Sequence, residues 1–209
     1  ALIAVFALVA CGGDDTEKEE TTTEDETSTD TETTGETYVI GATQIVEHPS
    51  LDNAFEGFKA ALEDAGLDVE YDYQNAQNDQ NNVKTISDNF VADDVDLIFA
   101  NSTPSAVGAL NATKDIPILF TSVTDPIGAE LVEAMDKPGY NITGVVDLHP
   151  DSIQETIQFI DEYFEGSEVG IVYDAGEANS VSQIEMILEA VEGTSLTVSE
   201  RTVANSSEV

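Results

Sequence analysis

The residues with the clearest chemical potential stand in a short turn at 101–106 (N-S-T-P-S-A). The turn follows an apolar run at 95–100, typical of a buried strand, and precedes small residues that favour a helix. Thr103 is a favourable N-cap and Pro104 a favourable first helical residue. Unpaired backbone N–H groups at such a helix start can bind an anion without a basic side chain. A similar turn at 121–126 (T-S-V-T-D-P) follows the next strand, so we expect the two turns to form half of a small-molecule site.

The ligand's charge can be inferred from the charged residues that are available. The only arginine is Arg201, near the end of the chain, so a carboxylate or phosphate would be held by N–H groups and by Ser or Thr hydroxyls. A ligand ammonium would need a carboxylate, which Asp125, Asp147 and Asp174 or Glu177 offer at predicted strand ends. Together these residues fit a zwitterion, meaning an amino acid. Each of them alone is also a normal cap or turn residue, and only their convergence at one sheet edge favours a site.

Motifs for catalysis and cofactor binding are absent from the sequence. It contains no G-x-G-x-x-G, no G-K-[ST] and no G-x-S-x-G. His48 and His149 each precede a proline and are interpreted as turn residues. One cysteine and two isolated histidines do not make a transition-metal site. We therefore expect no catalytic residues, no metal and no cofactor. An enzyme on the same fold stays as an alternative without a recognisable nucleophile–base pair.

Strands and helices alternate along the predicted domain. We expect helices at 50–66, from about 79 to 90, after 103, and at 127–135, 152–164 and 181–191, with Ser50 and Asp79 as N-caps and Gly66 as the stop of the first. We expect strands at 38–43, 68–74, 95–100, 116–121, 142–146, 168–173 and 196–203, and a further helix starting at 205–207. Such alternation predicts an α/β fold with parallel sheets flanked by helices. Ligands of these sheets bind outside the carboxyl ends of the strands.

Composition limits the class of partner. The 209 residues carry 43 acidic and 6 basic side chains, a net charge of −37, so binding to nucleic acid or to anionic membrane surfaces is not expected. The predicted folded part, 38–209, keeps 32 acidic and 5 basic residues, a net charge of −27. Adaptation to high salt and an ordinary acidic extracellular protein both explain this acidity.

The first 37 residues indicate export. Residues 1–10 are apolar and suit a signal peptide, and Leu8-Val9-Ala10-Cys11 resembles a bacterial lipobox with Cys11 as the lipidated residue. A signal peptide that happens to contain a cysteine, or a short buried helix, are the alternatives. Residues 12–37 hold 11 acidic residues and 10 threonines and no apolar side chain, which predicts a disordered acidic tether. Residues 1–11 are thus interpreted as a signal-peptide remnant and 12–37 as a tether.

Five segments resemble a known family. They are 43–52 (T-Q-I-V-E-H-P-S-L-D), 103–106 (T-P-S-A), 120–126 (F-T-S-V-T-D-P), 141–144 (N-I-T-G) and 173–181 (Y-D-A-G-E-A-N-S-V). They are similar to ABC-transporter substrate-binding lipoproteins of the aromatic-amino-acid (tryptophan/tyrosine) type, and the likeness covers 38–209. The resemblance implies a two-lobed, periplasmic-binding-protein-like (type I) fold that closes by hinge motion. The first lobe would be 38–146, and 147–209 would begin a second lobe that is incomplete here.

The resemblance also implies roles for particular residues. Thr43 and Gln44 would line the cleft, and Ser102, Thr103 and Ser105 would receive the carboxylate. Thr124 and Asp125 would close the same wall, Asp147 would lie at the hinge, and Glu177, Ala178, Asn179 and Ser180 would reach across from the second lobe. The sequence has no tryptophan, so an aromatic solute would rely on Tyr73, Phe120 or Tyr173.

The implied function is delivery of an amino acid, an aromatic one among the candidates, to an ABC permease and its ATPase. The protein would act outside the cytoplasm, attached to the bacterial cell membrane only through its lipid anchor. A ligand-sensing surface receptor and a sugar- or nucleoside-binding protein of the same fold remain alternatives. An effector domain of the sugar-repressor type is disfavoured because no helix-turn-helix precedes Tyr38.

Overall fold

A computed structural model describes residue 35, residues 37–204 and residue 208. The elements alternate as predicted, and they are listed here in chain order: β1 (Thr37–Gln44), α1 (Pro49–Asp64), β2 (Asp68–Asn75), α2 (Gln80–Ala92), β3 (Leu97–Asn101), α3 (Thr103–Ala112), β4 (Ile118–Val123), β5 (Ile142–Val146), α4 (Ser152–Tyr163), β6 (Glu168–Asp174), α5 (Ala178–Val191) and β7 (Thr197–Val203). Cys11 and the helix start predicted at 205–207 lie outside these residues, as does nearly all of the predicted tether. Among the described residues, no helix combines the length and the apolar character that a membrane span needs.

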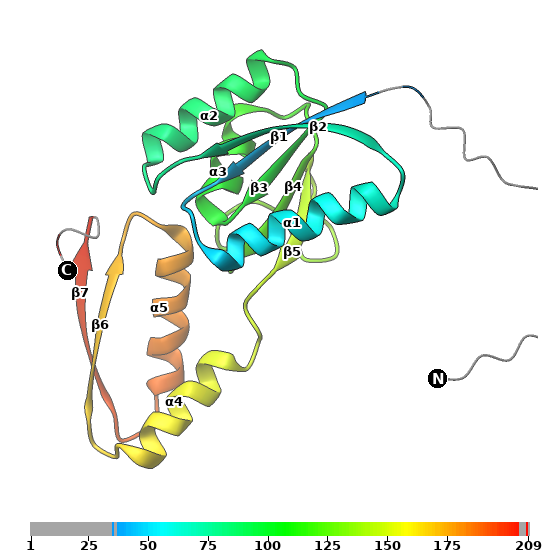
Figure 1. Ribbon diagram of the computed structural model, residues 1–209. Helices are drawn as coiled ribbons and strands as arrows, with labels where there is room; N and C mark the ends of the chain where they lie inside the picture. The colour runs from blue at the N-terminus through cyan, green and yellow to red at the C-terminus, as the bar shows by residue number, and fades with distance from the viewer. Residues whose placement is uncertain (1–34, 36, 205–207, 209) are drawn as a thin grey trace, which may run out of the picture. The chain divides into compact units, whose positions relative to one another are not determined.

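The first lobe is a five-stranded sheet in the order β2-β1-β3-β4-β5, in which every neighbouring pair is parallel. Helix α1 covers one face, and α2 and α3 cover the other (Figure 1). Because both faces are covered, the central strand β3 is apolar up to its last residue, Asn101, with Ile98, Phe99 and Ala100 buried. This arrangement brings the carboxyl ends of all five strands to one edge.

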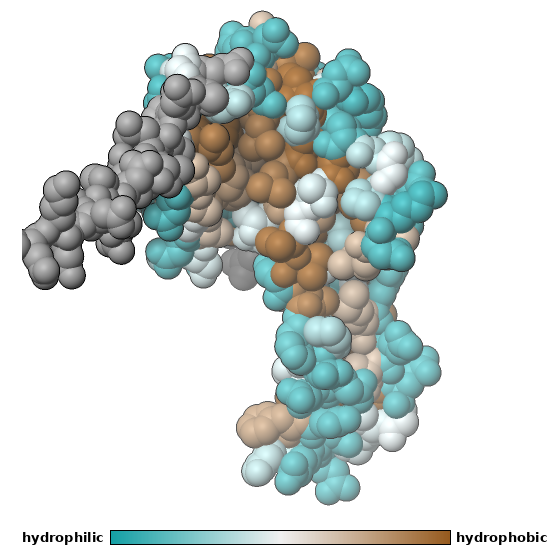
Figure 2. All heavy atoms as spheres, turned by 90° about the vertical axis from the view of Figure 1, so that its right-hand side faces the viewer, coloured by the Kyte–Doolittle hydropathy of each residue, from teal (hydrophilic) through white to brown (hydrophobic). Residues whose placement is uncertain are grey.

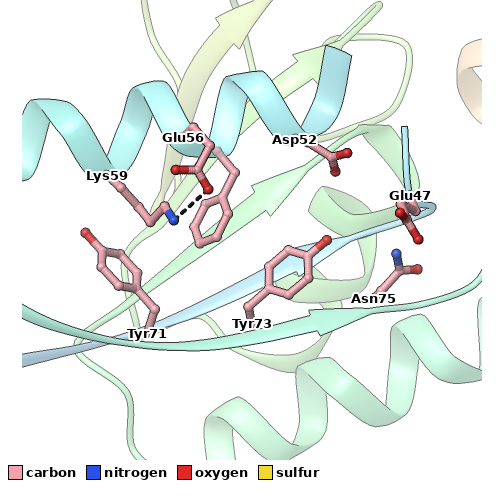
Figure 3. A pocket seen from close by; sticks show the side chains of 8 residues that line it. Glu47, Asp52, Glu56, Lys59, Tyr71, Tyr73 and Asn75 are labelled. Atoms are coloured by element: carbon pink, nitrogen blue, oxygen red, sulfur yellow. Dashed lines mark ion pairs between the residues drawn. The ribbon is translucent and has the colours of Figure 1, made fainter. Parts of the chain in front are cut away.

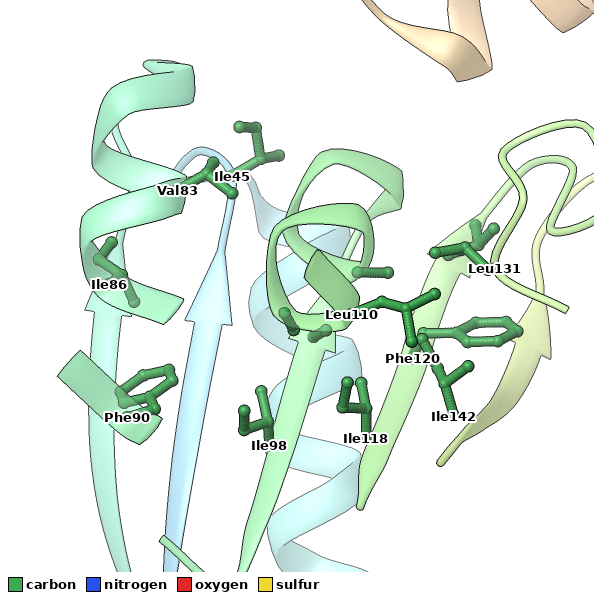
Figure 4. Close-up of a cluster of buried hydrophobic side chains, with 14 of the residues drawn as sticks. Ile45, Val83, Ile86, Phe90, Ile98, Leu110, Ile118, Phe120, Leu131 and Ile142 are labelled. Atoms are coloured by element: carbon green, nitrogen blue, oxygen red, sulfur yellow. The ribbon is translucent and has the colours of Figure 1, made fainter. Parts of the chain in front are cut away.

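The main core lies between the sheet and the helices α2 and α3 (Figure 4). Phe90 of α2 is fully buried and packs over Gly41 of β1, where an added Cβ would approach the ring to 2.6 Å. The opposite face is filled by aromatic rings of α1, with Phe58 stacked on Phe99 at 4.3 Å between centroids. These two layers fix α1 and α3 on the sheet, and with them the turns that precede both helices.

The strands β6 and β7 form a separate parallel pair that packs with α4 and α5 through Ile157, Ala190 and Leu196. The pair follows β5 in the chain, and the boundary after residue 146 stays a prediction. On the face of the molecule drawn in Figure 2, apolar side chains gather in one area with hydrophilic ones around it. Val145 of the edge strand β5 is 64% exposed, so the acidic composition does not make the surface uniformly polar.

Two local predictions outside the turn before α3 are wrong. Residues 127–135 form turns and a single bridge between Ala134 and Lys137 instead of a helix. The carbonyl of Pro126 accepts from both Leu131 and Val132, which buries these two apolar residues without a helix. The N-cap of α1 is His48, not Ser50: the His48 Nδ1 accepts from the Ser50 N–H at 3.2 Å.

Replacing Gly144 with alanine is expected to lower the free energy of unfolding by about 3 kcal/mol, because the new Cβ would overlap the Phe120 carbonyl on the paired strand. The matched control is Gly57→Ala in α1, where nothing lies within 4 Å and alanine should stabilise the helix by about 1 kcal/mol. Urea denaturation measures both. Midpoints that shift in the same direction would contradict the close packing of β4 against β5.

Candidate functional site

The carboxyl edge of the first sheet aligns polar residues from three adjacent strands. Gln44 at the end of β1 is paired with Asn101 at the end of β3, and Asn101 is paired with Thr121 of β4. Thr43 and Gln44 are each 1% exposed. The two turns chosen from the sequence therefore do lie side by side at one edge.

The turn between β3 and α3 contains several buried polar atoms without a hydrogen-bond partner. They are the Oδ1 of Asn101, the Oγ of Ser102, the Oγ1 of Thr103 and the Oγ of Ser105, together with the Oγ1 of Thr43 on the neighbouring strand. Thr103 and Ser105 are 2% and 0% exposed. Each buried polar group without a partner costs about 1–3 kcal/mol, and native proteins rarely gather such groups without a reason. A polar ligand at this turn would supply the missing partners.

The backbone of the two turns is strained. Ser102 has φ 96° and ψ 165°, a region that is almost restricted to glycine, and Ser122 has φ 56°. The Ser102 N–H donates to the Thr121 carbonyl at 3.0 Å, which joins the two turns directly. Strain of about 1–3 kcal/mol at one residue is typical of ligand sites. Sequence reasoning did not identify Ser122, since φ angles leave no signal at a serine.

Helix α3 begins one residue earlier than expected. Ser102 is its N-cap, without a side-chain capping bond, and Thr103 is its first residue rather than its cap. The first helical bond runs from the Ala106 N–H to the Ser102 carbonyl at 3.0 Å. The N–H groups of Thr103 and Ser105 precede Ala106, the first intrahelical donor, and so have no partner within the helix, and Pro104 has no N–H. The start of α3 therefore presents two donors and the positive end of the helix dipole to the same edge.

Gln44 is engaged in a structural network rather than free to meet a ligand. Its Nε2 donates to the Asp52 Oδ1 at 2.7 Å and to the Val46 carbonyl at 2.8 Å. Its Oε1 accepts from the Asn101 Nδ2 at 3.0 Å, and that nitrogen also donates to the Leu51 carbonyl at 2.8 Å. The network ties α1 to β1 and β3. Gln44 thus holds the ends of β1 and β3 and the start of α1 together, whereas the hydroxyl of the adjacent Thr43 has no partner.

Asp125 is also engaged. Its Oδ1 accepts from the N–H groups of Ile127 and Gly128 at 3.1 and 2.9 Å, and its Oδ2 accepts from the Ser182 hydroxyl of α5 at 3.2 Å. A Cβ at Gly128 would overlap this carboxylate. Asp125 therefore links the loop of the first lobe to α5, while its half-buried neighbour Thr124 is not involved. Ser182 was missed in the sequence, although it lies one helical turn after Ala178.

The other predicted residues lie on the second lobe or on the path to it. Asp147 is exposed, and its N–H donates to the Val123 carbonyl at 3.2 Å where the chain leaves the first sheet. Glu177 is the N-cap of α5, and Asn179 and Ser180 are half-buried in the first turn. The Oδ1 of Asn179 is buried without a partner. The start of α5 thus shares two features with the start of α3: no side-chain capping bond and a buried polar atom without a partner.

A cavity of about 580 Å³ opens at the carboxyl ends of β6 and β7. Asp174, Gly176 and Glu177 line it together with Gln80, the first residue of α2. Of the three aromatic candidates, Phe120 belongs to the hydrophobic core of the first sheet. Tyr173 donates through its hydroxyl to the Glu200 Oε2 at 3.1 Å. Within the described part of the chain, no three His, Cys, Asp or Glu side chains form a group that could hold a metal ion.

Comparison with known proteins identifies the family of the chain. The family described as "ABC transporter substrate binding protein" matches residues 39–209. A "Tyrosine-binding protein" of Clostridioides difficile is 43% identical over 171 residues, which are 79% of this chain and 49% of that protein. A solved domain in complex with L-Trp from Streptococcus pneumonia is 36% identical with a TM-score of 0.77, over 83% of this chain and 60% of the other. These are substrate-binding proteins, not enzymes.

A solved leucine-binding protein of Thermotoga maritima is 12% identical with a TM-score of 0.60, and the match covers 81% of this chain and 49% of that protein's chain. At this identity the likeness shows the fold alone. It confirms the periplasmic-binding-protein-like (type I) fold. The chain spans about half of the curated relative and three fifths of the L-Trp-bound domain.

Proposed function

Because the chain belongs to the family of ABC transporter substrate-binding proteins, we propose that it binds an amino acid between its two sheets and delivers it to an ABC permease and the associated ATPase. The observation that supports this most directly is the set of buried hydroxyls without partners at the start of α3. They lie beside the free N–H groups of the same helix. The relatives named for tyrosine and bound to L-Trp make an aromatic amino acid the first candidate.

The solute carboxylate is assigned to the start of α3. Hydroxyls of Ser102, Thr103 and Ser105 can donate to it together with the N–H groups of Thr103 and Ser105. Hydrogen bonds to a charged group contribute about 1.5–3 kcal/mol each. Several such bonds would do what an arginine side chain commonly does for a carboxylate, since the only arginine, Arg201, lies in β7. They also relieve the cost of burying the hydroxyls.

The solute ammonium is assigned to the second lobe. Glu177 and Asp174 line the cavity at the ends of β6 and β7, and Asn179 adds a buried amide oxygen without a partner. Asp125 is a weaker candidate than the sequence predicted, since three donors already occupy its carboxylate. An ammonium donates three hydrogen bonds, so two carboxylates and one amide oxygen suit it well.

The proposed function predicts selective stabilisation by an amino acid. In a thermal-shift assay of the complete protein, L-tyrosine or L-tryptophan at about one hundred times the dissociation constant should add about 2.7 kcal/mol of stability. For a protein of this size that corresponds to roughly 5–10 °C in Tm. Nucleosides and sugars serve as controls. A response to sugars alone would refute the zwitterion assignment.

Substrate-binding proteins of ABC transporters work outside the cytoplasm, where they meet their solute. Attachment through a lipid on Cys11, with the acidic residues 12–37 as a tether, is the part of this proposal that rests on the sequence alone. Metabolic labelling with a fatty acid, in the parent and in Cys11→Ser, tests it directly. Label that persists in the variant would exclude Cys11 as the anchor.

A further inference from the structure

A groove of about 610 Å³ runs between α1 and the edge strand β2, apart from the start of α3 (Figure 3). Aromatic and acidic residues predominate in its lining. The residues are Glu47, Asp52, Phe55, Glu56, Lys59, Tyr71, Tyr73 and Asn75. None of its side chains belongs to the hydroxyl set at the start of α3, although the Oδ1 of Asp52 accepts from Gln44 behind that site. The proposed function assigns no role to the groove, and Tyr73 is the one aromatic candidate from the sequence that lines it.

Aromatic rings form the floor of the groove. Phe55 is stacked with Tyr73 at 5.2 Å between centroids and meets Tyr71 edge-on at 5.7 Å. Phe55 is buried, whereas Tyr73 is 41% exposed. An exposed tyrosine ring supported from behind by a second ring offers a rigid, electron-rich face to a ligand.

The groove already holds one cation, supplied by the chain itself. The Lys59 ammonium lies 5.0 Å from the centre of the Phe55 ring and pairs with Glu56 at 2.6 Å. It occupies the end of the groove near Tyr71, as the dashed ion pair in Figure 3 shows. The contact places an alkylammonium against one aromatic ring and one carboxylate of the groove.

The other end of the groove carries negative charge without a cation. Figure 3 shows Asp52 and Glu47 at that end, on the far side of Tyr73 from Lys59. Burial raises the pKa of the Tyr73 hydroxyl, and the charges of Asp52 and Glu47 raise it further against a lowering by Asn75. At Tyr71, burial raises the pKa but Lys59 lowers it. The Tyr73 end therefore has a negative field that no lysine compensates.

We propose that the Tyr73 end of this groove is a second binding site, for an arylalkylamine, meaning an aromatic ring joined through an alkyl chain to an ammonium, without a carboxylate. The amine's ring would lie on the exposed face of Tyr73, and its ammonium would meet Glu47 and Asp52. A free carboxylate would be repelled by the same residues, so the groove would discriminate against amino acids. The site would thus take a solute class that differs from that of the cleft.

The test is titration of the complete protein with tyramine, followed by calorimetry or by NMR. We expect a dissociation constant on the order of 1 mM, with Tyr73→Leu weakening it at least fivefold. Tyr73→Phe, which keeps the ring, should bind within twofold of the parent. The matched control is Tyr140→Leu, a 56% exposed tyrosine whose ring faces Lys114 at 5.6 Å; it should leave tyramine binding unchanged.

Two results would overturn the proposal. One is tyramine binding that is absent or is indifferent to Tyr73→Leu. The other is tyramine binding that disappears in the double variant Ser102→Ala with Thr103→Ala, because the amine would then occupy the amino-acid site. That double variant should instead lose amino-acid binding alone, so failure of the groove and failure of the proposed function are told apart.

Discussion

Replacing Ser102 with glycine is expected to stabilise the fold by about 1–2 kcal/mol while weakening solute binding about tenfold or more. The gain follows from φ 96° and ψ 165° at Ser102, which glycine adopts without the strain that a side chain causes there. The loss follows from removal of a buried hydroxyl without a partner, which we assign to the solute carboxylate. Opposite signs on stability and binding are the signature of a residue kept for its ligand.

The matched control is Ser102→Ala, which removes the same hydroxyl but keeps a Cβ in the strained conformation. It should weaken binding as much as glycine does, while the glycine variant should be more stable than the alanine variant by about 1–2 kcal/mol, because only glycine relieves the backbone strain. Denaturation without solute measures the first quantity, and calorimetric titration with L-tyrosine measures the second. A glycine variant that binds as tightly as the parent would contradict the assignment of the Ser102 hydroxyl to the solute carboxylate.

The layered architecture could be predicted because its determinants are local. Apolar strands such as β3, and the cap Asp79 with its bond to the Asn81 N–H at 2.7 Å, are visible in the residue pattern. The turns at 127–135 were not, since a helical spacing of apolar residues also suits a loop anchored by the Pro126 carbonyl. His48 was missed as a cap because histidine rarely takes that position.

The residue types of the candidate site could be predicted from the sequence, but not which of them are hydrogen-bonded within the protein and which are left for a ligand. Ser102, Thr103 and Ser105 share a chemistry that the sequence displays, and the structure leaves their hydroxyls without partners. Gln44 has the same polar character, yet it is hydrogen-bonded at both ends of its amide. Only the tertiary packing of α1 against β1 and β3 decides between these roles. The left-handed backbone of Ser122 is equally invisible in a list of residues.

The Asn101→Asp substitution is expected to lower the free energy of unfolding by about 3–5 kcal/mol at pH 7. Asn101 is 1% exposed, and its Nδ2 donates to two oxygens, the Gln44 Oε1 at 3.0 Å and the Leu51 carbonyl at 2.8 Å. An aspartate would place an oxygen against both acceptors. Loss of these two bonds would loosen the contact of α1 with the end of β3, just before the turn at Ser102, so solute binding should fall together with stability.

The effect of Asn101→Asp should depend on pH with a definite sign. Burial and the two facing oxygens would raise the pKa of the new carboxyl in the folded state above its unfolded value of about 3.9. Stability would then be highest below that value, where the carboxyl is protonated in both states, and would fall as the pH rises toward the folded-state pKa. The matched control is Asn53→Asp, exposed near the start of α1, which should change stability by less than about 0.5 kcal/mol. Urea denaturation of both variants between pH 4 and 8, relative to the parent, measures the difference; a loss of equal size at every pH would mean that Asn101 acts through its shape and not through its two donated bonds.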